Sequence, residues 1–209
     1  MNYFEDIYLQ KLGTAELKRL EFQLTNWGLQ QPEFYLRIDK WFQNFKSEND
    51  KQLAYKIIMT LDYLNPQIIE DKITKLFVPV KKYLAEKGKT EMDLIVVIPN
   101  EKGDSSSRYS YDLVKLWGLV QSQIYEIRNF RQQYLKEKVA IFFNDTHGSG
   151  NQFIRTIFPL IKDVECKKFI LCLTITNEAL TKFKSLDKEI TVLPDIPCKT
   201  IFDCFTEID

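Results

Sequence analysis

The chain has 209 residues, of which 44% are hydrophobic and 28% are charged, a composition that is ordinary for a globular protein and too apolar for a disordered one. A chain of this length supports one hydrophobic core, or one core with a small accessory unit. Its 29 basic and 29 acidic residues cancel, so no overall positive field draws the protein onto nucleic acid.

The cysteines and the single histidine exclude two common kinds of site. Cys166, Cys172, Cys198 and Cys204 form no CxxC pair, and only His147 accompanies them, so neither a zinc site nor a disulfide framework is expected. No stretch of about 18 apolar residues occurs, and the first residues lack the apolar region of a signal peptide. We therefore expect a cytoplasmic protein with no membrane segment and no metal held by protein side chains alone.

Helical periodicity dominates the first ninety residues. Apolar residues recur on one side of four expected helices, at 17–27, 32–45, 47–64 and 65–87. Pro32 suits the first turn of the second helix, and Ser47 with Asp50 forms a weak capping pattern at the start of the third. The sequence therefore predicts an N-terminal helical segment over residues 1–90.

The period changes at 93–99, where a short, continuous apolar run rich in branched residues begins. Such runs are typical of strands buried on both faces. We expect strands at 93–99, 123–127, 139–143, 168–175 and 190–193, and helices at 109–120, 151–162 and 177–185. This alternation predicts an α/β domain over residues 91–209, with a parallel sheet in a three-layer arrangement and right-handed crossovers.

The clearest chemical signal lies in the segment VAIFFNDTHGSGNQ, Val139–Gln152. Glycines on both sides of Ser149 let the backbone approach an anion, and a helix that starts near Asn151 adds unpaired amides. Asp145 is suited to accept hydrogen bonds from a vicinal diol, and Ser149 to donate to a phosphate. A purely structural turn, in which Asp145 caps a neighbouring helix, is the alternative.

This segment resembles the ribose-phosphate motif of type I phosphoribosyltransferases, in which an apolar strand leads to two acids and then to Ser or Thr, Gly and a small residue. The ligand-binding residues that the resemblance implies are Asn144, Asp145, Thr146, His147, Gly148, Ser149, Gly150 and Asn151. Asn144 and Asp145 take the places of the acids that hold the ribose hydroxyls, and 149–151 take the place of the 5-phosphate clamp. Asn144 removes one expected charge, which weakens binding of ribose phosphate and its magnesium by about 1–3 kcal/mol.

A second loop, Ile98–Arg108, leaves the carboxyl end of a predicted strand, where open α/β sheets bind ligands. In the family resembled, the loop after the first core strand binds pyrophosphate. The resemblance therefore implies anion contacts by Lys102, Ser105, Ser106 and Arg108, and Mg²⁺ that enters with the bound diphosphate. Exposure to solvent explains these polar residues equally well.

Asp145 and His147 are the candidate catalytic residues. A histidine with an ordinary pKa titrates near neutrality, so His147 could act as a general acid or pair with phosphate as a cation. A lone loop histidine is more often incidental than catalytic. Gly148 stands where several enzymes of the family carry an acidic base, although that position varies among active members.

Three further segments extend the resemblance over most of the chain. They are WFQNF at Trp41–Phe45, LAYKIIMTLDYL from Leu53 and ILCLTITNEAL from Ile170. These segments resemble a prokaryotic phosphoribosyltransferase-like family found in conflict and phage-defence neighbourhoods, including retron cassettes. Members of that family carry a helical segment before the α/β core, so the resemblance implies the same fold here.

The resemblance implies a protein of anti-phage defence that binds a ribose 5-phosphate-containing ligand, such as phosphoribosyl diphosphate or a nucleotide. It leaves open a magnesium-dependent phosphoribosyltransferase or nucleotide-processing enzyme, and a catalytically inactive nucleotide sensor or interaction scaffold in a defence complex. A protein partner or homo-oligomer is expected, with nucleic acid bound only through a partner. A nucleic-acid reader in residues 1–90 is a third hypothesis, but the helices concentrate little basic charge.

Overall fold

The computed structural model describes residues 22, 25, 40–41, 43–60, 64, 66–99, 109–194 and 197–198. The helices expected at 17–27 and 32–45 fall mostly outside the described residues. Helix α4, Glu48–Thr60, begins where the capping pattern predicts, and the hydroxyl of Ser47 accepts a hydrogen bond from the amide of Asp50 at 3.1 Å. That bond satisfies one of the unpaired amides of the first turn.

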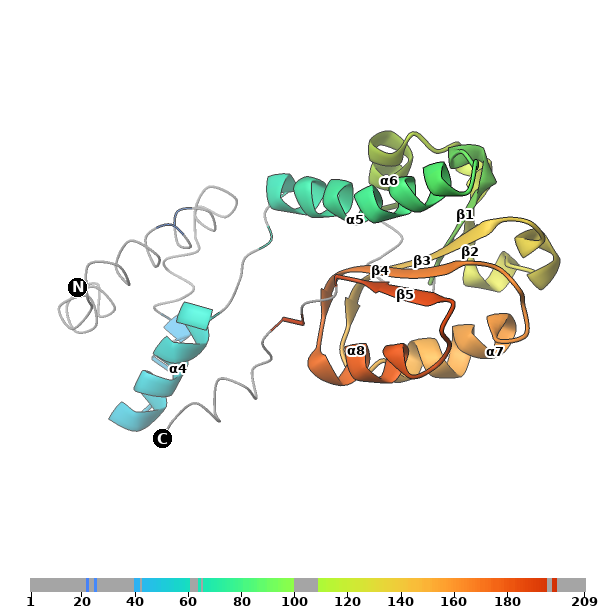
Figure 1. The fold of residues 1–209 in the computed structure, drawn as a ribbon. Coiled ribbons are helices and arrows are strands. Elements are labelled where there is room, and N and C mark those ends of the chain that lie inside the picture. The colour runs from blue at the N-terminus through green and yellow to red at the C-terminus, as the bar shows by residue number, and fades with distance from the viewer. Residues whose placement is uncertain are drawn as a thin grey trace. The chain divides into compact units, whose positions relative to one another are not determined.

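A five-stranded parallel sheet forms the centre of the α/β unit (Figure 1). Its strands are β1 (Leu94–Ile98), β2 (Ile124–Glu126), β3 (Val139–His147), β4 (Lys168–Ile175) and β5 (Ile190–Leu193), in the order β2-β1-β3-β4-β5. Every neighbouring pair is parallel. The central strands β1, β3 and β4 are almost entirely buried, which explains their continuous apolar runs. The predicted parallel α/β sheet is confirmed.

Helices cover both faces of this sheet (Figure 1). They are α5 (Pro66–Glu86) and α6 (Ser110–Trp117) on one face, and α7 (Phe158–Ile161) and α8 (Asn177–Lys184) on the other. Short 3-10 turns occupy Glu91–Asp93, Gln121–Gln123, Ile127–Asn129 and Gln132–Leu135. The result is the expected three-layer arrangement. Within the ranges that the structure describes, no helix has the length and apolar character needed to cross a bilayer.

Helix α5 is part of the layer that covers the sheet. The indole nitrogen of Trp117 in α6 donates a hydrogen bond to the carbonyl of Ile73 at 2.9 Å, and the Trp117 ring stacks on Phe77 with centroids 4.7 Å apart. Trp117 also contacts Phe143 of β3 edge-on. The compact unit that contains the sheet spans Ile69–Cys198, so the boundary expected at residue 90 lies within it.

Candidate functional site

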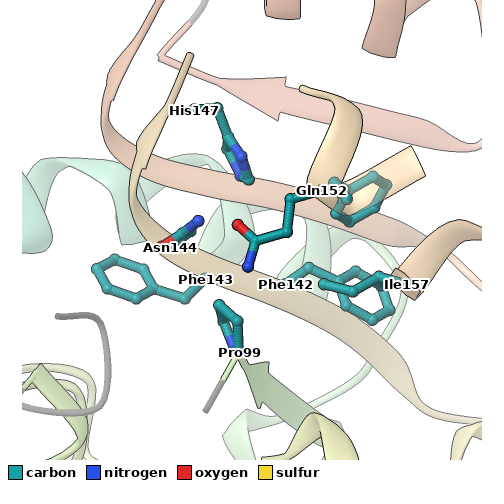
Figure 2. Close-up of a pocket in the computed structure, with 8 residues that line it drawn as sticks. Pro99, Phe142, Phe143, Asn144, His147, Gln152 and Ile157 are labelled. Atoms are coloured by element: carbon teal, nitrogen blue, oxygen red, sulfur yellow. The ribbon is translucent and has the colours of Figure 1, made fainter. Parts of the chain in front are cut away.

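The order of the strands reverses between β1 and β3, and open α/β sheets bind ligands at the carboxyl ends of the strands at such a point. A small pocket lies there (Figure 2). Its lining residues are Pro99, Phe142, Phe143, Asn144, His147, Gln152, Phe153 and Ile157. Apolar side chains form most of the wall, and the side chains of His147 and Gln152 extend into the pocket from above in Figure 2.

Strand β3 is longer than the sequence predicts. It runs to His147 and does not stop at Phe143, so the predicted strand bounds of 139–143 are too short at the carboxyl end. The reason is that β4 extends beside this polar stretch and pairs with it, and the hydroxyls of Thr146 and Thr174 lie 2.9 Å apart across the two strands. The loop itself is therefore reduced to residues 148–150, at the carboxyl edge of the sheet.

Gly150 occupies a position that only glycine fits without strain. Its φ of +72° lies in the left-handed region, and a Cβ atom there would lie 2.9 Å from Cε1 of Phe183 in α8. The chain turns helical at Asn151, as predicted, and passes through a π-helical stretch, Phe153–Ile157, before α7. The loop is thus packed directly against α8 before the helix begins.

Three successive carbonyl groups of this loop are held by hydrogen-bond donors. The bonds run from Thr176 Oγ1 to the carbonyl of Gly148, from Lys182 Nζ to that of Ser149 at 3.0 Å, and from the amide of Ile154 to that of Gly150 at 3.1 Å. In a trans peptide the next N–H group points opposite to the carbonyl. The amides of residues 149–151 therefore point away from these donors.

Few of those amides have a hydrogen-bond partner among the described residues. Among the described residues, the amides of Ser149 and Gly150 make no hydrogen bond, and the amide of Asn151 makes only a 3.4 Å contact with Ser149 Oγ. Ser149 and Asn151 are exposed at the edge of the sheet, whereas Gly150 between them is buried. Successive amides at the start of a helix attract negative charge, so this loop has the geometry of an anion-binding site.

The side chain of Asn144 binds its own backbone. Its Oδ1 accepts a hydrogen bond from the amide of Asp145 at 2.9 Å, and its Nδ2 donates to the carbonyl of Thr146 at 3.2 Å. The residue is only 7% exposed. An aspartate could accept the first of these bonds but could not donate the second, so the departure from the two-acid motif has a structural reason.

Asp145 and Thr146 follow at the edge of the sheet, where Asp145 is half-buried and Thr146 is exposed. The negative charge of Asp145 acts on the imidazole of His147, so the two candidate catalytic residues are close neighbours. The structure therefore brings the predicted loop residues Asn144–Asn151 together at the end of β3. Their roles toward a ligand stay predictions.

His147 is buried, at 6% exposure, and packs edge-on against Phe183 and Phe153, with ring centroids 4.9 and 6.1 Å away. Burial lowers the pKa of His147 to about 4, although the charge of Asp145 opposes this shift. The expectation of an ordinary histidine pKa is therefore wrong, and the ring is neutral at pH 7. Its Nε2 has no hydrogen-bond partner among the described residues.

The second predicted loop lies largely outside the described residues. This holds for all four expected anion contacts, Lys102, Ser105, Ser106 and Arg108. The residues that flank the gap, Pro99 and Tyr109, are both buried, and Pro99 lines the pocket of Figure 2. The end of β1 therefore contributes to the same edge of the sheet as the end of β3.

Three residues at the site were not predicted from the sequence. They are Thr176 and Lys182, which bind loop carbonyls, and Gln152, which lines the pocket. Thr176 precedes a helical pattern and could have been recognised as a helix cap. Nothing in the local sequence links Thr176 or Lys182 to a loop about 30 residues earlier, because sequence pattern carries no information on such contacts.

The reversing parallel sheet, with its amide-lined loop at the carboxyl end of a central strand, is the architecture of a phosphoribosyltransferase-like α/β protein. The PRTase-CE family model matches residues 38–207, and the chain belongs to this phosphoribosyltransferase-like family. No curated protein and no solved structure matches the chain.

Proposed function

We propose that the chain binds a ligand that contains a ribose 5-phosphate, such as phosphoribosyl diphosphate or a nucleotide, at the carboxyl end of β3. The observation that carries the proposal is the set of amides at 149–151, which point away from the donors that hold the neighbouring carbonyls. In this arrangement the phosphate lies on those amides and the ribose lies near Asp145. The similarity of the loop to the ribose-phosphate motif supports a sugar phosphate over a simple anion.

In this proposal, Mg²⁺ binds together with the diphosphate group of the ligand. In the part of the chain that the structure describes, no group of three or more His, Cys, Asp or Glu residues could hold a metal ion. Mg²⁺ commonly binds through one or two carboxylates together with phosphate oxygens and water. Asp145, at the end of β3 beside the loop, is the candidate for such a carboxylate.

A second candidate function is a catalytically inactive nucleotide sensor or interaction scaffold in a bacterial anti-phage defence complex. Two observations favour it over turnover. Asn144 replaces an acid and uses its amide within the backbone, and His147 is neutral at pH 7. The resemblance to members from conflict and defence neighbourhoods supports this cellular setting.

Calorimetry with ribose 5-phosphate, AMP and magnesium phosphoribosyl diphosphate tests the binding proposal. We expect saturable binding by the wild type and a loss of about tenfold in affinity in Asp145→Asn, since a hydrogen bond to a charged group contributes about 1.5–3 kcal/mol. Asp163→Asn makes the same chemical change at an exposed position and should bind like the wild type. Equal affinity in the two variants would contradict the assignment of Asp145.

Release of pyrophosphate from phosphoribosyl diphosphate separates the two candidate functions. Magnesium-dependent release by the wild type that is lost in Asp145→Asn selects the enzyme. Binding without release selects the sensor. If none of the three ligands binds, the ribose 5-phosphate proposal is wrong.

A further inference from the structure

Lys182 of α8 donates to three oxygen atoms, two of them on residues 149–151 and one on its own helix. Its Nζ lies 3.0 Å from the carbonyl oxygen of Ser149, 3.1 Å from Oδ1 of Asn151 and 2.6 Å from Oε1 of Glu178. An ammonium group has three protons, so these three acceptors use its whole donor capacity. The amine is therefore held by two loop residues and by one carboxylate of its own helix.

The contact with Ser149 fixes a peptide group that would otherwise be free to rotate. The carbonyl of Ser149 and the amide of Gly150 belong to one planar unit, so holding the oxygen toward α8 directs the amide away from it. Glycine permits many backbone conformations, and this peptide is the one that leads into Gly150. Thr176 fixes the preceding peptide in the same way.

The contact with Asn151 acts on the polarity of the site. An amide oxygen repels an anion, whereas an amide NH₂ group attracts one. Because Lys182 binds Oδ1 of Asn151, it keeps this partially negative oxygen directed toward α8. The amide oxygen of Asn151 is then kept away from the side of the loop that carries the backbone amides.

Glu178 indicates that Lys182 acts through orientation more than through its charge. The carboxylate of Glu178 forms an ion pair with Lys182 one turn away on α8, with side chains 61% and 35% exposed. The pair has little net charge, and exposed pairs of this kind contribute only about 0–1 kcal/mol to stability. The main effect of Lys182 is therefore to hold a hydrogen-bond donor at a fixed position beside the loop.

From these contacts we propose that Lys182 is a positioning residue, which sets the peptide orientation that lets the loop bind phosphate. This inference rests on the proposed function, because it concerns the same phosphate. It adds a contact from α8 to the loop residues that the sequence predicts to bind phosphate.

Calorimetry with ribose 5-phosphate compares Lys182→Met with Lys184→Met. Both variants remove one positive charge from α8, and no bond of Lys184 to the loop is seen among the described residues. We expect about tenfold weaker binding for Lys182→Met, equivalent to the loss of one charged hydrogen bond, and no change for Lys184→Met. Lys182→Arg keeps a charged donor and should restore part of the affinity. Melting curves establish that each variant is folded at the temperature of measurement.

The amide signal of Gly150 in a ¹⁵N–¹H spectrum tests the orientation without a ligand. In Lys182→Met this signal should move, and in Lys184→Met it should stay where it is in the wild type. If the wild type binds none of the three ligands named above, the proposed function is contradicted and the Gly150 signal alone decides the inference. An unmoved Gly150 signal in Lys182→Met, or equal affinities of the two methionine variants, would overturn it.

Discussion

At the scale of single residues, Asn144 shows how a departure from a motif can serve the fold. Replacing it by aspartate restores the two-acid pattern but places a carboxylate beside the carbonyl of Thr146, which now accepts a hydrogen bond at 3.2 Å. We expect Asn144→Asp to lower the free energy of unfolding by about 1–3 kcal/mol. Urea denaturation measures this change.

The matched control is Asn151→Asp. Asn151 is exposed at the start of a helix, where an acid is favourable, and an aspartate there can still accept the hydrogen bond from Lys182. This variant should be as stable as the wild type or slightly more stable. If Asn144→Asp proves equally stable, the amide bonds of Asn144 contribute nothing to the strand end.

His147 should make stability depend on pH. Its pKa is about 4 in the folded state, below the ordinary value of 6.5, so the unfolded chain binds the proton more readily between these values. The stability that comes from the neutral ring is therefore complete above pH 6.5 and is lost as pH falls toward 4. Between pH 7 and pH 5 we expect a loss of about 2 kcal/mol that His147→Gln does not show.

Since His147 is the only histidine, the difference between wild type and His147→Gln in urea titrations at the two pH values isolates this imidazole. Acidic groups titrate in both proteins and cancel in the comparison. Parallel pH profiles would mean that the ring is hydrated in solution and keeps an ordinary pKa.

At the scale of elements, Thr176 joins the start of α8 to the loop after β3. Its hydroxyl accepts a hydrogen bond from the amide of Ala179 at 3.3 Å as a helix cap and donates to the carbonyl of Gly148. Thr176→Val keeps the shape of the side chain and removes both bonds. We expect a loss of about 1–2 kcal/mol in thermal or chemical unfolding.

Thr181→Val is the control for this change, because Thr181 is an exposed position on the same helix. It removes a hydroxyl of the same kind and should change stability by less than about 0.5 kcal/mol. A similar loss in both variants would indicate a general cost of valine in α8 and no specific effect of the cap.

The sequence predicted elements well where hydrophobic burial alone determines them. β4 and β5 have the predicted bounds, because their apolar runs begin and end with the strands. β3 was predicted too short, since Asn144–His147 are polar and their strand conformation depends on pairing with β4. A pattern based on hydrophobicity cannot detect a polar strand end.

The candidate site was predictable only where single residues determine the course of the backbone. Glycine spacing located the loop, because close approach of a backbone needs residues without a Cβ atom. The burial of His147 between Phe153 and Phe183, and the bond from Lys182, depend on how α8 packs on the loop. Such contacts follow from tertiary structure and left no local signal.

At the scale of the whole molecule, α5 makes the α/β unit larger than residues 91–209. It buries five apolar side chains, Ile73, Leu76, Phe77, Val80 and Leu84. Their burial contributes on the order of 10 kcal/mol, which is comparable with the whole stability of a typical domain. A fragment of residues 91–209 should therefore fail to fold, whereas a fragment of residues 66–209 should keep its core.

Tryptophan fluorescence distinguishes the two fragments, because both contain Trp117 and neither contains Trp27 or Trp41. In the longer fragment Trp117 stays between Phe77 and Phe143, and its emission should be that of a buried indole. In the shorter fragment the emission should move to longer wavelength. If both fragments show the emission of a buried indole, the sheet can protect Trp117 from water without α5.

Thr176 makes two hydrogen bonds through one hydroxyl group, and this affects how the chain opens locally. Because one hydroxyl bonds both the first turn of α8 and the loop, an opening of the turn that moves Thr176 also releases the carbonyl of Gly148. A ligand that binds only the closed loop must then slow hydrogen exchange at the amide of Ala179, a residue that it does not touch. Ligand binding at the loop would then be measured as slower hydrogen exchange in the first turn of α8.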